Sequence, residues 1–134
     1  MPPNKKCIMI ATNQHIPESS LQDLQHVCQK IFYKKGFNIL TLDVRGVSTM
    51  TDFFVIAEGN VDRHVSALAK EVKEYFYSIG RKPLHAEGER EGDWVVLDYG
   101  EVVIHLLIPD MREKYQIEQV WKQGVVVPVS FQTK

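Results

Sequence analysis

Three carboxylates at the ends of expected strands are the residues of this chain best placed to do chemistry. Asp43 and Asp98 each close an apolar run, and Asp52 opens another. Carboxylates at strand ends can hold magnesium for phosphoryl transfer. Such sites usually add an acidic pair on one strand and a phosphate-holding Gly-Ser turn, and the chain has no D-x-D pair. We therefore expect these acids to shape turns, with Asp52 and Asn60 capping backbone amides.

Histidine, cysteine and serine offer equally little for catalysis. The sequence contains no H-x-x-x-H, H-E-x-x-H, G-x-S-x-G, P-loop or G-x-G-x-x-G motif. His105 lies within an apolar run, where a hydrogen-bonded side chain in the sheet layer or at an interface is expected. Cys28 lies on an apolar helix face and predicts a buried, reduced thiol. We expect no catalytic residue, metal or cofactor, and so no enzyme.

Acidic and aromatic residues indicate binding instead. Residues 87–101 contain six acids against one base, Arg90. We call these acids the acidic rim: Glu87, Glu89, Glu91, Asp93, Asp98 and Glu101. Trp94 starts a strand beside the rim, and its alternation partner Asp98 is polar, so we expect an exposed Trp. Because Trp and Tyr are favoured interface anchors, this combination predicts docking on a basic partner.

A second aromatic group lies on an expected helix near the C-terminus. Tyr115, Glu118 and Trp121 follow each other at spacings of three, which places them on one helix face. They could bind the partner together with the rim. The alternative is that Tyr115 and Trp121 anchor the helix on the sheet.

The overall composition is that of an ordinary globular domain. The chain has 134 residues, 44% hydrophobic and 25% charged, with a net charge of −1. This charge argues against nucleic acid held by bulk electrostatics, and no sequence-specific nucleic acid is expected. No apolar run is long enough for a membrane span or a signal peptide. The expected location is the cytoplasm.

Hydrophobic spacing predicts seven elements. A helix capped by Ser19 or Ser20 runs to Gly36, and a second helix follows Gly59-Asn60 and stops at Gly80. Strands are expected at 39–44 and 53–57, the second one central because both of its faces are apolar. A hairpin joins 94–98 to 101–108 through Tyr99-Gly100, and a last helix covers 110–123.

These elements predict an α+β (α/β-like) fold, in which one mixed β-sheet is covered by helices. Residues 19–123 would form the domain. Residues 1–18 would be a loose leader with a short strand at 7–11, and residues 124–134 a C-terminal tail.

Three segments resemble the Iojap family, the ribosomal silencing factors. They are T-D-F-F-V-I-A-E-G-N-V-D-R-H-V (51–65), E-G…D-W-V-V-L-D-Y-G-E-V-V-I-H (87–105) and R-E-K-Y-Q-I-E-Q-V-W (112–121). The resemblance runs from about Leu21 to Trp121. It departs from the family pattern at four positions: Val61, Glu101, Ile117 and Val120.

The resemblance implies a nucleotidyltransferase-like fold that lacks the catalytic motif. It also implies binding to the large ribosomal subunit through its protein L-fourteen, which blocks joining of the small subunit and represses translation. A further expectation is that the protein can form a homodimer when it is not bound to the ribosome. Two alternatives remain open: a degenerate nucleotidyltransferase-like protein that binds nucleotide or magnesium, and a large-subunit assembly factor. The expected partner-binding residues are Trp94, Asp98, Tyr99, Glu101, Glu89, Glu91, Asp93, Tyr115, Glu118 and Trp121.

Overall fold

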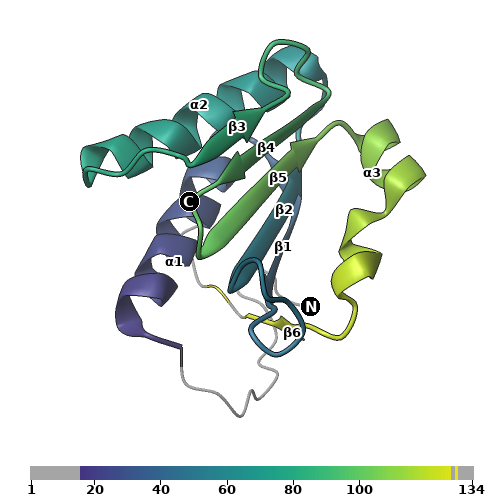
Figure 1. The fold of residues 1–134 in the computed structure, drawn as a ribbon. Helices are drawn as coiled ribbons and strands as arrows, with labels where there is room; N and C mark the ends of the chain where they lie inside the picture. Colours follow the sequence, from purple (N-terminus) through teal and green to yellow (C-terminus); the bar gives the residue numbers. More distant parts are fainter. Residues whose placement is uncertain (1–15, 128, 130–134) are drawn as a thin grey trace.

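The fold is a six-stranded mixed sheet with helices on both faces (Figure 1). The structure is a computed structural model, and it describes residues 16–127 and residue 129. The strands are β1 (Phe37–Asp43), β2 (Phe53–Glu58), β3 (His85–Glu87), β4 (Trp94–Asp98), β5 (Val102–Leu107) and β6 (Val125–Val126). Their order in the sheet is β3-β4-β5-β2-β1-β6. Only the β2–β5 pair is parallel, so the predicted mixed sheet is confirmed.

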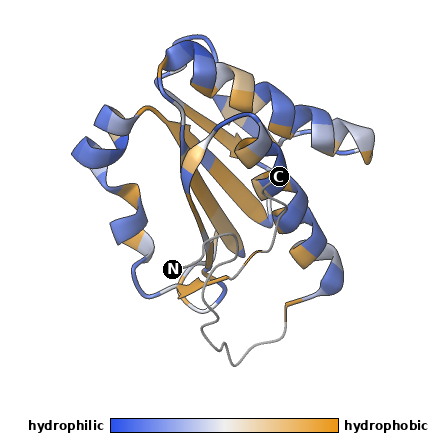
Figure 2. Ribbon diagram, turned by 180° about the vertical axis from the view of Figure 1, so that it is seen from behind, coloured by the Kyte–Doolittle hydropathy of each residue, from blue (hydrophilic) through white to orange (hydrophobic). Residues whose placement is uncertain are grey.

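Two long helices cover one face of the sheet. They are α1 (Glu18–Tyr33) and α2 (Asp62–Ser78), whose apolar stripes pack on one side of β2, β4 and β5. Figure 2 shows the apolar strands between helices whose surfaces are largely polar. All six residues of β2 are buried, which confirms the central position predicted for this strand. This side of the sheet holds the main core.

A shorter segment lies on the opposite face. It consists of α3 (Pro109–Tyr115) and a 3₁₀ helix, η1 (Ile117–Trp121), and we call the two together the arm. The arm packs on a second, smaller cluster that includes Phe54, Ile56 and Leu107. The single helix predicted for 110–123 is therefore wrong, because Gln116 adopts a left-handed conformation (φ 45°) and breaks it.

The predicted hairpin between β4 and β5 is confirmed, but its turn is shifted by one residue. The Tyr99 amide donates to the Val102 carbonyl at 2.9 Å, and Gly100 has a φ of +93°. Tyr99 therefore pairs with Val102, and the two-residue turn is Gly100-Glu101 and not the predicted Tyr99-Gly100. The positive φ falls at the first position of this turn, where it favours glycine.

Three details differ from the sequence prediction, and a fourth is not tested. The expected serine cap is wrong, because the Leu21 amide donates to the Pro17 carbonyl and places both serines inside α1. The polar segment 81–93 contains β3. Helical spacing places Ile79 on the apolar stripe of the second helix, but Ile79 is exposed because α2 ends at Ser78. The predicted strand at 7–11 lies outside the described residues.

The C-terminal residues continue the domain beyond the boundary that we set at residue 123. β6 pairs with β1 at Leu42 and Asp43, and the Val127 amide donates to the Thr41 carbonyl. Val127 and Val129 are buried in the main core. Residues 124–127 and 129 therefore belong to the packed structure.

Candidate protein-binding site

Trp94 lies on the face of the sheet that carries the arm. Its neighbours Val95 and Leu97 point into the main core, so alternation places Trp94, Val96 and Asp98 on the other face. Trp94 is partly buried against the second cluster, so the exposed Trp that we expected is only partly accessible.

His105 fixes the indole of Trp94 from within the sheet. Trp94 Nε1 donates to His105 Nδ1 at 3.1 Å, and the His105 ring lies 4.9 Å from the ring of Phe54. This confirms the prediction of a hydrogen-bonded histidine in the sheet layer. Since Nδ1 accepts, a neutral His105 carries its proton on Nε2. Burial lowers the pKa of His105 to about 4, so the ring is neutral near pH 7.

The buried His105 should make stability depend on pH. An unfolded histidine has a pKa of about 6.5. Because the folded pKa is lower, about 4, the unfolded state takes up the proton first as the pH falls from 6.5 to 4. The free energy of unfolding should therefore fall across this window, by less than the single-proton limit of about 1.4 kcal/mol per pH unit. Urea denaturation of wild type and His105→Leu at pH 7 and pH 5 checks this. Equal losses of stability in the two proteins would contradict it.

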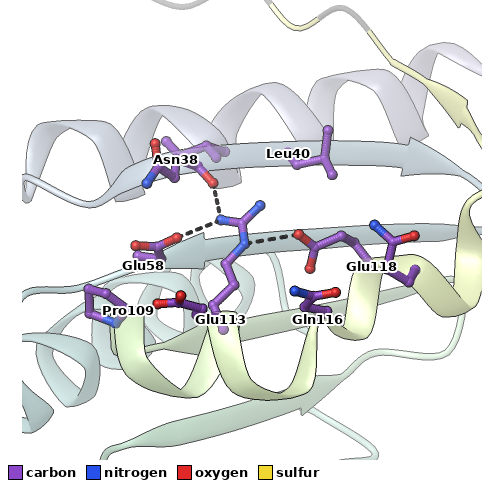
Figure 3. A pocket seen from close by; sticks show the side chains of 10 residues that line it. Asn38, Leu40, Glu58, Pro109, Glu113, Gln116 and Glu118 are labelled. Carbon is purple, nitrogen blue, oxygen red and sulfur yellow. Dashed lines mark hydrogen bonds and ion pairs between the residues drawn. The ribbon is translucent and has the colours of Figure 1, made fainter.

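Arg112 attaches the arm to the sheet. Its guanidinium donates to the Asn38 carbonyl, to Glu58 Oε2 at 3.2 Å and to Glu118 Oε2 at 3.4 Å (Figure 3). Neither α3 nor η1 contains a fully buried residue. This ion cluster, lying in an open groove between β1 and the arm, is therefore a main element of the attachment.

The expected shared face of Tyr115, Glu118 and Trp121 is wrong, because the break at Gln116 separates Tyr115 from the other two. Tyr115 lies 5.2 Å from the Trp94 ring and is half exposed. Trp121 packs at 6.3 Å from Phe54, and Glu118 bonds to Arg112. The alternative, in which Tyr115 and Trp121 anchor the helix on the sheet, therefore holds for Trp121, while Glu118 helps to attach the arm and Tyr115 remains half exposed beside Trp94.

Among the residues that the structure describes, some carboxylates of the acidic rim have a bonding partner and others have none. Glu89 bonds to Lys73 at 2.7 Å, and Glu101 bonds to Arg81 at 2.9 Å. One oxygen of Asp98 accepts from the Gly100 amide at 2.8 Å. Glu87 and Glu91 are exposed and Asp93 is partly buried. The charge that remains for a partner is concentrated on fewer acids than the sequence suggested.

Tyr99 does not lie on the accessible surface, contrary to its place among the expected partner-binding residues. Its ring is only 4% exposed and stacks on Phe76 at 3.8 Å. Burial, the largest cause, raises the pKa of Tyr99 to about 12. The side chain follows the core-facing alternation of Val95 and Leu97, and this register would have revealed its burial.

The arm leaves part of its sheet face uncovered. We call this part the open face, formed by Trp94, Val96, Asp98, Val103 and His105, all partly accessible. The register places Val96 opposite His105 and Asp98 opposite Val103. Glu87 pairs with Val96 from β3 and so projects on the same side. The structure therefore brings an apolar strip and acids together on one surface.

Asp43 and Asp98, two of the three carboxylates first considered for magnesium, bond to neighbouring groups of the protein. Burial alone would raise the pKa of Asp43, but the hydrogen bonds and charge of Arg45 outweigh it and lower the pKa. Ser48, and not Asp52, caps the loop before β2, because its Oγ accepts from the amides of Met50 and Thr51. Within residues 16–127 and 129, no group of three or more His, Cys, Asp or Glu side chains could hold a metal ion.

The helices were also compared with the length and hydropathy of a membrane span. Across the part of the chain that the structure describes, none is long and apolar enough to span a bilayer.

Sequence reasoning missed Arg112, Glu58 and Asn38 as a cluster. Arg112 and Glu58 stand 54 residues apart, so their contact has no local signal. A usable hint was present, since Glu58 ends a fully apolar strand, where a carboxylate needs a cationic partner.

Comparison with known proteins gives consistent matches. The family described as Ribosomal silencing factor during starvation matches residues 17–134. The ribosomal silencing factor of Bacillus subtilis is 36% identical over 98 residues, which cover 73% of this chain and 83% of that protein. The mouse protein named Mitochondrial assembly of ribosomal large subunit protein 1 is 36% identical over 102 residues, 74% of this chain and 45% of that protein. A crystal structure of a Chromobacterium violaceum protein has a TM-score of 0.73 at 30% identity and covers 75% of this chain and 84% of that chain.

Proposed function

Because this chain belongs to the ribosomal silencing factor family, we propose that it binds the large ribosomal subunit through its protein L-fourteen. Bound there, it prevents the small subunit from joining and so represses translation in the cytoplasm. The mechanism is steric occupation and needs no chemical step. Family membership supports the more general role in repression of translation at the ribosome or in assembly of the large subunit.

The open face carries this proposal. It combines a partly accessible Trp94 with the apolar Val96 and Val103, and acids flank the strip. Glu87 projects on the same side. A basic ribosomal protein would complement these charges, while the apolar strip would supply buried contact area.

Sedimentation with purified ribosomal particles tests the proposal. The protein should travel with free large subunits, and neither with small subunits nor with joined ribosomes. Adding it before the two subunits are mixed should reduce the fraction that joins. Binding to small subunits, or undiminished joining at saturating protein, would contradict the proposal.

A second function, assembly of the large subunit, has a specific observation in its favour. The mouse relative is named for that process and is 36% identical over 74% of this chain. If assembly is the main role, depletion of this protein should accumulate immature large particles even during growth in rich medium. If prevention of subunit joining is the main role, depletion should leave mature large subunits and change only the fraction of large subunits that is joined to small subunits.

Unpaired acids should set the rate of association. The double substitution Glu87→Gln and Glu91→Gln removes two exposed charges, so the association rate at low salt should fall on the order of threefold or more and depend less on salt. Stopped-flow binding to large subunits at several salt concentrations measures both effects. The matched control, Glu18→Gln with Glu74→Gln, removes two exposed charges from α1 and α2 on the other side of the sheet. Equal slowing by both double variants would point to net charge and not to this surface.

A further inference from the structure

We propose that His105 is a positioning residue for docking, which binds the only polar atom of the Trp94 side chain and so leaves an apolar ring for the partner. The partner must then offer an apolar side chain at Trp94 and not a hydrogen-bond acceptor. This inference rests on the proposed function and specifies the chemistry of the contact at the same site.

The hydrogen bond between the two side chains is the first observation. An indole has one polar atom, the Nε1–H group, which can only donate. In this structure it donates to His105 Nδ1 at 3.1 Å. Trp94 therefore has no remaining donor for a partner.

Neighbouring rings hold this pair in place. The His105 ring packs at 4.9 Å from Phe54, a residue of the central strand that is 1% exposed. On the arm, the Tyr115 ring lies 5.2 Å from that of Trp94. His105 thus links the indole to the rigid centre of the sheet, while Tyr115 limits its movement from the side. An anchor that is ordered before binding loses less conformational entropy when the partner arrives.

The protonation state of His105 suits the role of acceptor. Burial lowers its pKa to about 4, so Nδ1 keeps its lone pair at neutral pH. Both partly buried groups satisfy each other, and neither needs water. A carbonyl or carboxylate pressed against Trp94 would lose its own water without gaining a donor, which is unfavourable.

Three variants separate this role from a merely structural one. His105→Leu keeps an apolar side chain of similar size but removes the acceptor, and His105→Met is a second apolar replacement in case leucine is not tolerated. His105→Asn retains an oxygen close to the position of Nδ1. We expect the apolar variants to unfold at urea concentrations equal to or above wild type, yet to bind large subunits about five- to tenfold more weakly. The Asn variant should recover most of the affinity despite its polar, less stable core.

Two further measurements test whether His105 affects binding through the indole of Trp94. The indole N–H signal of Trp94 in ¹H–¹⁵N spectra, assigned by its loss in Trp94→Phe, should exchange slowly with water in wild type and Asn and faster in the apolar variants. In a Trp94→Phe background, which has no N–H group, His105→Leu should cause no additional loss of binding.

The outcomes distinguish this inference from the proposed function. Wild-type binding combined with undiminished binding of both apolar variants would overturn the inference alone. An equal loss on adding His105→Leu to Trp94→Phe would do the same, because His105 would then act independently of the indole. A wild-type protein that fails to bind the large subunit would overturn the proposed function and this inference with it.

Discussion

Replacing Trp94 with alanine should weaken binding to the large ribosomal subunit by about 30- to 1,000-fold, corresponding to about 2–4 kcal/mol. Trp94 is the largest apolar side chain of the open face and lies beside Tyr115 of the arm, at the end of the strip that Val96 continues. Truncation removes the largest apolar contact area of this surface and leaves His105 Nδ1 without its donor. Equilibrium titration of fluorescently labelled protein with large subunits measures the change.

Stability must be measured on the same variant, since Trp94 also packs on the second cluster. The main core, between the sheet and α1 with α2, contains none of its atoms, so the variant should remain folded at room temperature. Tyr77→Ala is the matched control, because Tyr77 is an aromatic residue of α2 that is 51% exposed on the other side of the sheet. If Trp94→Ala instead unfolds, or binds as well as Tyr77→Ala, Trp94 is a packing residue and not an anchor.

Hydrophobic periodicity predicted the elements that are stabilised by their own burial. The stripe of α2 (Val65, Leu68, Ala69, Val72 and Phe76) is buried as expected, and β2 is apolar on both faces and central. In each case apolar residues recur at the positions that the helix or strand buries away from water, so the sequence pattern predicts the element directly. The sheet order could not follow from such patterns, because pairing depends on contacts between distant segments.

The missed elements depend on their neighbours instead. β3 is three exposed residues that adopt a strand because β4 presents an edge to pair with. The arm breaks at Gln116, a residue with no intrinsic preference for a positive φ. Its geometry follows from Arg112 reaching Glu58 on β2, which no local spacing encodes.

The candidate site was predicted by residue type better than by geometry. Trp94 and its acidic neighbours were recognised from composition, and the structure places Trp94 and Val96 on one face with Glu87. Pairing inside the molecule changed the rest: Lys73 neutralises Glu89, and Arg81 neutralises Glu101. Side-chain partners from distant segments decide which charges stay available. A count of acids in the sequence therefore overestimates the negative charge that the acidic rim can offer to a partner.

Arg112→Ala should destabilise the protein by about 3 kcal/mol and loosen the arm. The Arg112 and Glu58 side chains are only 13% and 10% exposed, so the substitution leaves Glu58 as a nearly buried carboxylate without its cation. Glu118 also loses its bond to the guanidinium. Urea denaturation measures the stability, and affinity for large subunits should fall as well, because Tyr115 is then no longer held beside Trp94.

Adding Glu58→Gln to Arg112→Ala tests the physical cause of this loss. The amide removes the uncompensated charge, so the double variant should be more stable than Arg112→Ala alone. Glu113→Gln is the matched control, since Glu113 is exposed on the same helix and lines the same groove without an ion pair among the described residues. That control should unfold within about 0.5 kcal/mol of wild type. If Arg112→Ala is as stable as the control, the arm is held by Trp121 and its apolar contacts, and the ion cluster does not contribute to stability.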